Sequence, residues 1–255
     1  MNETRPPQGA QAALRAVRLL KLFTIERPDM SLSEISQAAG LNKTTTHRLL
    51  RALQSEALIA RNSATSAYCL GPGLMALGVQ ALASSDLRRR VRPLLKTLAR
   101  ESGETATLEV QVENSMMVLD EVAGGHVVAA TGHVGTRWPM HATSTGKVWL
   151  AFDEGSMERI DDRLPPLGPK TLTTREALQP QIMEIRERGY AETVDELEDG
   201  FAAVATVIRG LLGDVLGTMS ICGPTQRLNA TRRKEYAALL CRSVARLEGN
   251  SNYRQ

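Results

Sequence analysis

The chain has 255 residues, of which 42% are hydrophobic and 23% are charged, so it suits one large domain or a small domain joined to a medium one. Its apolar runs, such as Val127 to Ala130, are far shorter than the roughly 18 residues that a membrane helix needs, and the first 30 residues lack the pattern of a secretory signal. The composition therefore argues against a membrane protein and predicts a cytoplasmic one.

Cysteine and histidine usage gives no sign of a disulfide framework or a metal site. Cys69, Cys222 and Cys241 are scattered and form no C-x-x-C pair, which predicts ordinary thiols. None of the usual zinc-ligand spacings is formed by the four histidines, which are His47, His126, His133 and His141. We expect no metal and no cofactor.

The net charge is only +3, but the charge is unevenly distributed. Residues 1–90 hold 12 Lys and Arg against 6 Asp and Glu, whereas the remainder holds 19 against 22. A basic first third joined to a slightly acidic remainder is typical of a module that binds a polyanion and is fused to a second module.

Two amphipathic helices open the chain. Residues Leu14 to Phe23 place their apolar side chains near one helical face, and a break follows at Arg27-Pro28-Asp29. Ser31 and Glu34 have the spacing of a capping box, which predicts the start of a second helix. Gly40 is placed to end that helix in a left-handed conformation.

A third helix begins after Asn42, its predicted N-cap. At 100° per residue, Thr46 falls on the leucine-rich face, whereas short hydroxyl and basic side chains fall on the opposite face and on the first turn. Such side chains at a helix start can approach phosphates and base edges closely. The candidate DNA-binding residues of this helix are Lys43, Thr44, Thr45, His47, Arg48 and Arg51.

Two short strands, Leu58 to Arg61 and Ala67 to Leu70, flank a polar tip at Asn62 to Ser66. They predict a hairpin wing in which Arg61 touches DNA backbone or minor groove. The whole module then has the order of a winged helix-turn-helix, with its third helix in the major groove. The alternative is a three-helix core whose polar surface serves protein contacts.

A connecting helix follows the break at Gly71-Pro72-Gly73, and Leu87 to Ser102 forms a longer amphipathic helix ended by Gly103. Arg88, Arg89 and Arg90 could extend a nucleic-acid surface, although a solvated helical face is the favoured interpretation.

The second half combines strands and helices. Residues Thr105 to Val112 alternate between apolar and polar, as a half-buried strand does. Further strands are predicted at Met116 to Val122, Val127 to Ala130, Phe201 to Ile208 and Leu212 to Cys222. Helices are predicted at Arg175 to Arg188, capped by Thr173 with Glu176 and closed by Gly189, and at Thr231 to Leu247. This order predicts an α+β domain with a central antiparallel sheet.

The segment Pro139 to Lys147 is the most motif-like part of this half. Gly146-Lys147 is not a phosphate loop, because the leading glycine and the final Ser or Thr are missing. Ser144-x-x-Lys147 has the spacing of serine–lysine enzymes, but their companion motifs are absent. Two interpretations remain open: a hydroxyl-rich loop whose helix N–H groups bind an anionic ligand, and plain helix capping by Thr143 or Ser144.

Five ordered blocks resemble the IclR family of bacterial transcriptional regulators over nearly the whole chain, from about Leu14 to Leu247. They are Ala38 to Leu50, Tyr68 to Gly71, Pro139 to Lys147, Arg188 to Ala191, and Ser220 to Pro224. The resemblance implies a ligand-responsive, sequence-specific DNA-binding regulator, not an enzyme, that senses a small organic acid or related metabolite. Its partners would be a palindromic double-stranded DNA operator and further copies of itself, as a homodimer or a dimer of dimers.

The resemblance also implies the domain plan: a flexible tail (1–12), a winged helix-turn-helix (13–72), a linker helix (73–86), a GAF-like α/β-sandwich effector-binding domain (87–250) and a tail (251–255). Carried over by position, the effector pocket would be lined by Ser144, Thr145, Thr193, Phe201, Ala203, Ser220 and Cys222.

Three positions depart from the family pattern. Ala203-Val204-Ala205-Thr206 stands where members have a cysteine followed by Ala-Ala-Pro, Thr193 stands at an acidic position, and Cys222 replaces a serine. These changes predict a pocket that is more apolar, or differently polar, than in acid-binding members. Alternative functions are a regulator that has lost its ligand, and a metabolite-binding or catalytic protein whose first module only dimerises.

Overall fold

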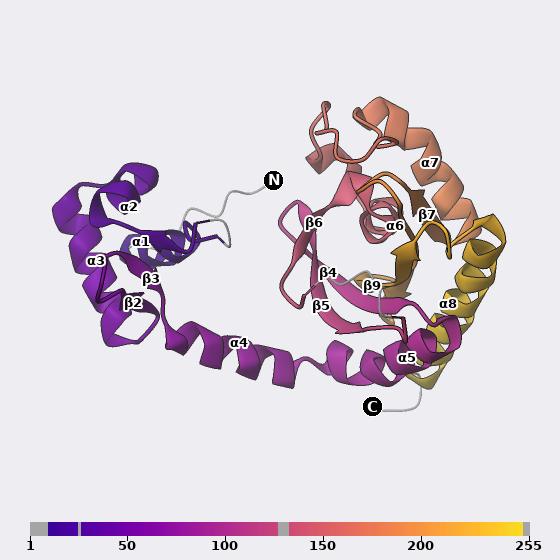
Figure 1. Cartoon of the computed structure of the whole chain (residues 1–255), viewed down its shortest axis with the longest axis horizontal. Coiled ribbons are helices and arrows are strands. Elements are labelled where there is room, and N and C mark those ends of the chain that lie inside the picture. The colour runs from indigo at the N-terminus through magenta and orange to yellow at the C-terminus, as the bar shows by residue number, and fades with distance from the viewer. Residues whose placement is uncertain (1–9, 25–26, 127–132, 252–255) are drawn as a thin grey trace. The chain divides into compact units, whose positions relative to one another are not determined.

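The computed structural model describes residues 10–24, 27–126 and 133–251. The chain divides into two compact units, Met1–Ser84 and Ser85–Gln255 (Figure 1). Each unit has its own hydrophobic core. None of the helices in the described part of the chain is long and apolar enough to cross a membrane.

The first unit contains three packed helices and a small antiparallel sheet in the order β1-β3-β2. The helices are α1 (Gln11–Leu20), α2 (Leu32–Ala39) and α3 (Lys43–Ser55), and the strands are β1 (Asp29–Met30), β2 (Ile59–Arg61) and β3 (Tyr68–Leu70). Their shared core consists of Leu19, Phe23, Met30, Ile35, Leu49, Leu50, Leu53, Ile59 and Tyr68. The predicted winged helix-turn-helix is confirmed.

Local capping fixes where these helices begin and end. The Ser31 hydroxyl accepts the Glu34 N–H while the Glu34 carboxylate accepts the Ser31 N–H, so the predicted capping box is present. Gly40 ends α2 at φ 63°, in the left-handed region that favours glycine. Asn42 Oδ1 accepts the Thr45 N–H at 2.8 Å and caps α3.

A further helix, α4 (Pro72–Ser84), follows β3 and closes the first unit. Gly71 allows the chain to leave the wing, because a Cβ atom there would lie 2.2 Å from the Ala57 carbonyl oxygen. None of the residues of α4 is buried, although the helix is largely apolar.

The second unit is built on a six-stranded antiparallel sheet in the order β6-β5-β4-β9-β8-β7. Its strands are β4 (Thr105–Val112), β5 (Ser115–Val122), β6 (Arg137–Pro139), β7 (Tyr190–Val194), β8 (Phe201–Arg209) and β9 (Val215–Pro224). Its helices are α5 (Asp86–Ser102), α6 (Ser144–Phe152), α7 (Arg175–Arg188) and α8 (Ala230–Ser251), with single 3-10 turns η1 (Met140–Ala142) and η2 (Met157–Arg159). The predicted α+β fold is confirmed.

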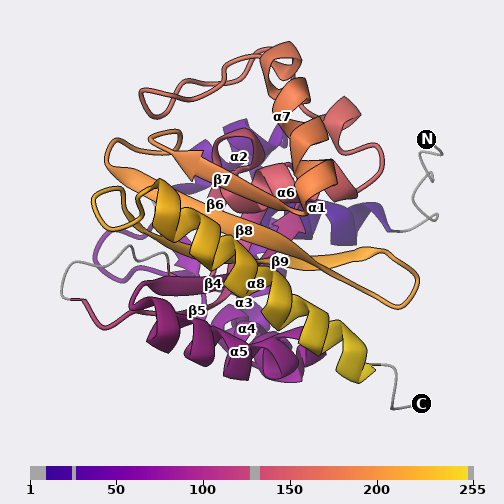
Figure 2. The same ribbon diagram turned by 90° about the vertical axis from the view of Figure 1, so that its right-hand side faces the viewer.

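Helices cover both faces of this sheet. Figure 2 shows α8 crossing the strands, and both α5 and α8 bury their apolar faces against that side. On the opposite side, α6 and α7 form a second core. The alternation along β8 divides the two cores: Ala202 and Val204 face α5 and α8, whereas Ala205 and Val207 face α6 and α7.

Some local predictions need correction. Thr174, and not Thr173, caps α7: its Oγ1 accepts the Ala177 N–H at 3.1 Å, while the Thr173 carbonyl is used by the Leu164 N–H at 2.8 Å. The last strand begins at Val215 instead of Leu212, because residues 210–214 form the turn before it.

Three strands, β1, β6 and β7, were not predicted, and the predicted strand at Val127 to Ala130 lies outside the described residues. The face of α5 that carries Arg88 is not wholly solvated either. Arg88 Nε lies 3.3 Å from Oδ2 of the buried Asp120, and Arg92 pairs with the other oxygen of that carboxylate.

Candidate functional site

The outward face of α3 is open to solvent in the folded unit. Thr46, Leu49, Leu50 and Leu53 are buried and anchor the helix. The Thr46 hydroxyl donates to the Asn42 carbonyl at 3.0 Å, so this threonine belongs to the core and to the cap. Of the predicted residues of this helix, Thr45 is half-buried, and the exposed ones are Lys43, Thr44, His47, Arg48 and Arg51.

The electrostatics of this face suit a polyanion. No acidic residue lies within α3, and its first turn carries Lys43 and two threonine hydroxyls. The helix N-terminus adds a partial positive charge from N–H groups that have no partner within the helix. Phosphates or acceptor atoms of base edges are the groups that this arrangement can bind.

Arg61 lies on the wing, where the wing itself fixes its guanidinium group. Its Nε donates to the Ser66 carbonyl at 3.0 Å, and its Cζ lies 5.5 Å from the centre of the Tyr68 ring. At the tip, Asn62 Oδ1 accepts the Ala64 N–H at 2.9 Å, which shapes the turn. The exposed Arg61 is therefore held at a defined place on the hairpin.

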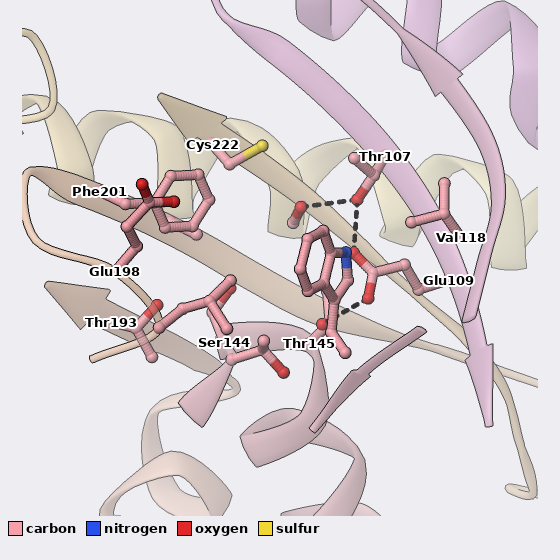
Figure 3. A pocket seen from close by; sticks show the side chains of 14 residues that line it. Thr107, Glu109, Val118, Ser144, Thr145, Thr193, Glu198, Phe201 and Cys222 are labelled. Atoms are coloured by element: carbon pink, nitrogen blue, oxygen red, sulfur yellow. Dashed lines mark hydrogen bonds between the residues drawn. The ribbon is translucent and has the colours of Figure 1, made fainter. Parts of the chain in front are cut away.

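A cavity of about 140 Å³ lies in the second unit on the α6 side of the sheet (Figure 3). All seven residues predicted for an effector pocket line it, namely Ser144, Thr145, Thr193, Phe201, Ala203, Ser220 and Cys222. The remaining lining residues are Thr107, Glu109, Val118, Trp138, Thr143, Leu197 and Glu198. All six strands of the sheet and the start of α6 thus contribute residues to the lining of this cavity.

A chain of hydrogen bonds crosses the floor of this cavity. The Thr145 hydroxyl donates to Glu109 Oε2 at 2.7 Å, and the Thr107 hydroxyl donates to Glu109 Oε1 at 2.9 Å (Figure 3). Thr107 Oγ1 also lies 2.7 Å from Ser220 Oγ. The Glu109 carboxyl group is therefore the centre of the polar lining.

Burial dominates the electrostatics of Glu109. Only 5% of the residue is exposed, and desolvation raises the pKa of its carboxyl group. The hydrogen bonds from Thr145 and Thr107 oppose this rise, whereas the Glu121 charge adds to it. Burial likewise raises the pKa of the Cys222 thiol, and the negative charge of Glu109 raises it further.

Sequence reasoning missed Glu109, although it gave a signal. Glu109 lies on the polar side of the alternating strand β4, together with Thr107, while Ala106 and Leu108 pack against α5 and α8. The alternation predicts a strand with one buried face, and nothing within the strand indicates that α6 covers the polar face as well.

Lys147 is a second residue whose position is decided by packing. It is fully buried, pairs with the Glu196 carboxylate and donates to Gln181 Oε1 at 2.6 Å. Burial lowers the pKa of Lys147 and raises that of Glu196, while the attraction between them opposes both shifts. The ammonium group of Lys147 thus forms a structural ion pair, which connects α6 to the segment that carries Leu197 and Glu198.

The start of α6 has the capping geometry that was one of the two open interpretations. Thr143 Oγ1 accepts the Gly146 N–H at 3.2 Å. Gly146 is required here because a Cβ atom would lie 2.3 Å from both Cα and O of Met140. In the same segment, His141 Nε2 lies 3.0 Å from the Pro165 carbonyl oxygen, and burial lowers the pKa of this imidazole.

Comparison with known protein families gives one match for each of the two units. Residues 12–63 match the IclR helix-turn-helix domain, and residues 79–247 match the bacterial transcriptional regulator IclR C-terminal domain. The chain belongs to the IclR family of bacterial transcriptional regulators. As a member of the IclR family, it is a DNA-binding transcriptional regulator.

Individual IclR-type relatives match along most of their length. The HTH-type transcriptional regulator KdgR of Escherichia coli (strain K12) is 27% identical over 252 residues, covering 98% of this chain and 95% of the relative. The HTH-type transcriptional regulator Rv1719 of Mycobacterium tuberculosis is 31% identical over 244 residues, covering 94% and 92%. A solved IclR homolog from Microbacterium hydrocarbonoxydans, complexed with 4-hydroxybenzoate, is 25% identical with a TM-score of 0.76, covering 96% of this chain and 100% of that one.

Proposed function

We propose that this regulator binds a palindromic operator through α3 and the wing, and that a small molecule in the cavity of the second unit controls this binding. One observation supports DNA binding through α3. The face of this helix that carries basic and hydroxyl side chains is exposed, opposite its buried leucines. On the proposal, the first-turn residues Lys43, Thr44 and Thr45 meet phosphates and base edges. His47, Arg48 and Arg51 line the groove-facing side, and Arg61 on the wing contacts the backbone.

The cavity supports the effector half of the proposal. Its volume of about 140 Å³ is close to that of a cavity of about 150 Å³ that holds one benzene molecule. The solved relative binds 4-hydroxybenzoate, a ligand built on one benzene ring. A ligand that prefers one conformation of the domain shifts the population able to bind the operator, typically with about 1–3 kcal/mol of coupling.

On the proposal, a second copy of the chain supplies the second recognition helix that a palindromic operator requires. Two recognition helices on a symmetric operator must lie about 34 Å apart, or a multiple of that distance. The helix α4 exposes Met75 by 70% and Val79 by 66%, and these residues share one helical face at a spacing of four. We assign this apolar face to the homodimer contact, either in a dimer or in a dimer of dimers.

The DNA half is tested by selecting sequences from a random DNA pool and then measuring their affinity at a fixed salt concentration. The double variant Arg48→Ala/Arg51→Ala is expected to lose specific binding. The matched double variant Lys96→Ala/Arg100→Ala, on exposed positions of α5, should retain it. Equal loss in both double variants would remove α3 from the DNA interface.

The dimer contact is tested by sedimentation of the variant Met75→Glu/Val79→Glu. Charges on the apolar face of α4 should shift the protein toward the monomer and weaken operator binding. An unchanged sedimentation coefficient at every concentration would show that α4 is not the contact.

A further inference from the structure

The helix start at the cavity already has a carboxylate beside it. Thr145 lies in the first turn of α6, where the helix dipole favours negative charge. Its hydroxyl donates to Glu109 at 2.7 Å, so the carboxylate of β4 stands next to this helix end. A negative charge on this carboxyl group would therefore lie beside the helix end that would otherwise favour an anionic ligand.

The hydrogen-bond chain presents acceptors to the cavity. The single Thr107 hydroxyl proton goes to Glu109, so Ser220 must supply the proton for its contact with Thr107. Ser220 then offers only lone pairs to a further group, as does Thr145 after donating to Glu109. Each Glu109 oxygen keeps a lone pair beyond its one hydroxyl partner. A ligand therefore meets acceptors at all three side chains.

The charge of the residues that line the cavity also disfavours an anionic ligand. Among the fourteen lining residues that the structure describes, none is Lys, Arg or His, and two are glutamates. Glu109 is 5% exposed, whereas Glu198 is exposed at the edge of the cavity. Once Glu109 is ionised, the form that its two hydroxyl donors favour, it would repel a carboxylate ligand beside it without screening by water, and such like-charge contacts cost several kcal/mol.

One polar atom in the cavity lining also lacks a partner. Thr193 is 2% exposed, and no described residue forms a hydrogen bond with its Oγ1. Figure 3 shows Thr193 beside Ser144, at a distance along the cavity from Glu109. Buried hydroxyl groups are nearly always hydrogen-bonded, so this atom marks a second point where a ligand would bind.

We propose that the cavity selects a ligand of about benzene size that is uncharged or positively charged, carries an N–H or O–H donor toward Glu109, and is not a carboxylate. This inference rests on the proposed role of the cavity as the effector site. Glu109 is its specificity-determining residue, and Thr193 is a second contact. The expectation of an acid ligand that family resemblance gives is thereby reversed for this chain.

Three probes of similar size separate the possibilities: benzyl alcohol, benzylamine and benzoate. Calorimetric titration of the full-length protein at about pH 8 keeps benzoate and most benzylamine charged, and requires no DNA. We expect the wild type to bind benzyl alcohol or benzylamine at least about tenfold more tightly than benzoate, which corresponds to about 1.4 kcal/mol. A wild-type protein that binds benzoate most tightly, or that binds none of the three, would overturn the proposal.

Two variants identify the residue responsible. Glu109→Gln keeps the shape of the side chain but removes its charge, and should improve benzoate affinity about tenfold or more while weakening benzylamine. Glu198→Gln makes the same change at an exposed position and should move both affinities less. An equal gain for benzoate in both variants would contradict the assignment to Glu109.

The wild-type preference among the probes needs no variant, so a poorly folded Glu109→Gln does not weaken the test. Operator binding in the absence of probes is measured separately. A protein that binds operator but prefers benzoate would contradict only the ligand class, whereas a protein with the expected probe preference and no operator binding would contradict only the proposed function.

Discussion

Thr145 on α6 and Glu109 on β4 are 36 positions apart in sequence, and they meet at 2.7 Å in a buried hydrogen bond at the wall of the cavity. This contact joins a helix start to the central sheet and places a carboxyl group where little water can reach it. Because its pKa is raised by burial, the protonation of Glu109 is coupled to folding.

Glu109→Gln is expected to raise the melting temperature more at high pH than at low pH. Since folding raises the pKa of Glu109, the native state holds this proton more tightly than the unfolded chain does. The stability linked to that proton is complete below the unfolded pKa of about 4.3 and is lost as pH rises through the native value. Glutamine has no charge to bury, so its advantage should grow as the pH rises from the unfolded pKa through the raised native pKa, which measurements from about pH 4.5 to about pH 8 would follow.

Melting curves of wild type and variant across this pH range measure the effect. The charge of Glu121 and the Cys222 thiol also interact with this carboxyl group, and both residues remain unchanged in the variant. Glu154→Gln, at an exposed site, is the control and should alter stability by no more than about 0.5 kcal/mol. A difference that shrinks as pH rises would contradict the assignment of burial as the dominant cause.

The two threonines at positions 44 and 46 should separate stability from DNA binding. Thr46→Val removes the buried hydrogen bond to Asn42 and should cost about 1 kcal/mol of unfolding free energy. Thr44→Val changes an exposed side chain, so stability should stay within about 0.5 kcal/mol while operator affinity falls. Urea unfolding and DNA titration of the same samples give both quantities. If Thr44→Val lowered stability and Thr46→Val lowered only operator affinity, the buried and exposed faces of α3 would be wrongly placed.

Removing one partner of the Lys147–Glu196 pair should be more damaging than removing both. Lys147→Met leaves the Glu196 carboxylate without its cation and should cost about 3–5 kcal/mol. The double variant Lys147→Met/Glu196→Leu replaces the pair by apolar groups and should recover much of the loss. Denaturant midpoints of the wild type and both variants decide this. A single variant as stable as the double one would show that the pair is not desolvated as the structure indicates.

Alanine should have opposite effects at two helical glycines. At Gly146 the new methyl group would lie 2.3 Å from backbone atoms of Met140, and the overpacking should cost about 1–3 kcal/mol. At Gly78 in α4 a Cβ atom meets nothing within 4 Å, so higher helix propensity should stabilise by about 1 kcal/mol. Thermal unfolding of both variants provides the comparison. Stabilisation by Gly146→Ala would mean that α6 does not approach η1 as closely as described.

Much of the first unit could be predicted from local sequence. The Ser31–Glu34 capping box, the left-handed Gly40 and the Asn42 cap each depend on residues within one turn of the helix they bound. The inward position of Thr46 followed from helical periodicity alone. Predictions of this kind hold because the interacting groups are close in sequence, so few tertiary arrangements can alter them.

Only part of the cavity lining could be predicted from the sequence. Ser220 and Cys222 alternate along one strand, and family resemblance suggested that they share a space with Ser144 and Thr145, which the structure brings together. Glu109 could not be placed, because period-two alternation marks the two faces of β4 without revealing that α6 covers the polar one. Whether that carboxyl group is solvated or buried depends on a helix that begins 35 residues after it.

Sequence by itself determined the caps that bound α2 and begin α3, the basic face of α3 and the order of the two units, since each arises from contacts or composition within a short stretch. Only tertiary structure decided that Lys147 is buried against Glu196 and that Glu109 faces a cavity. Burial depends on which distant element covers a side chain, and burial sets the electrostatic properties of both groups.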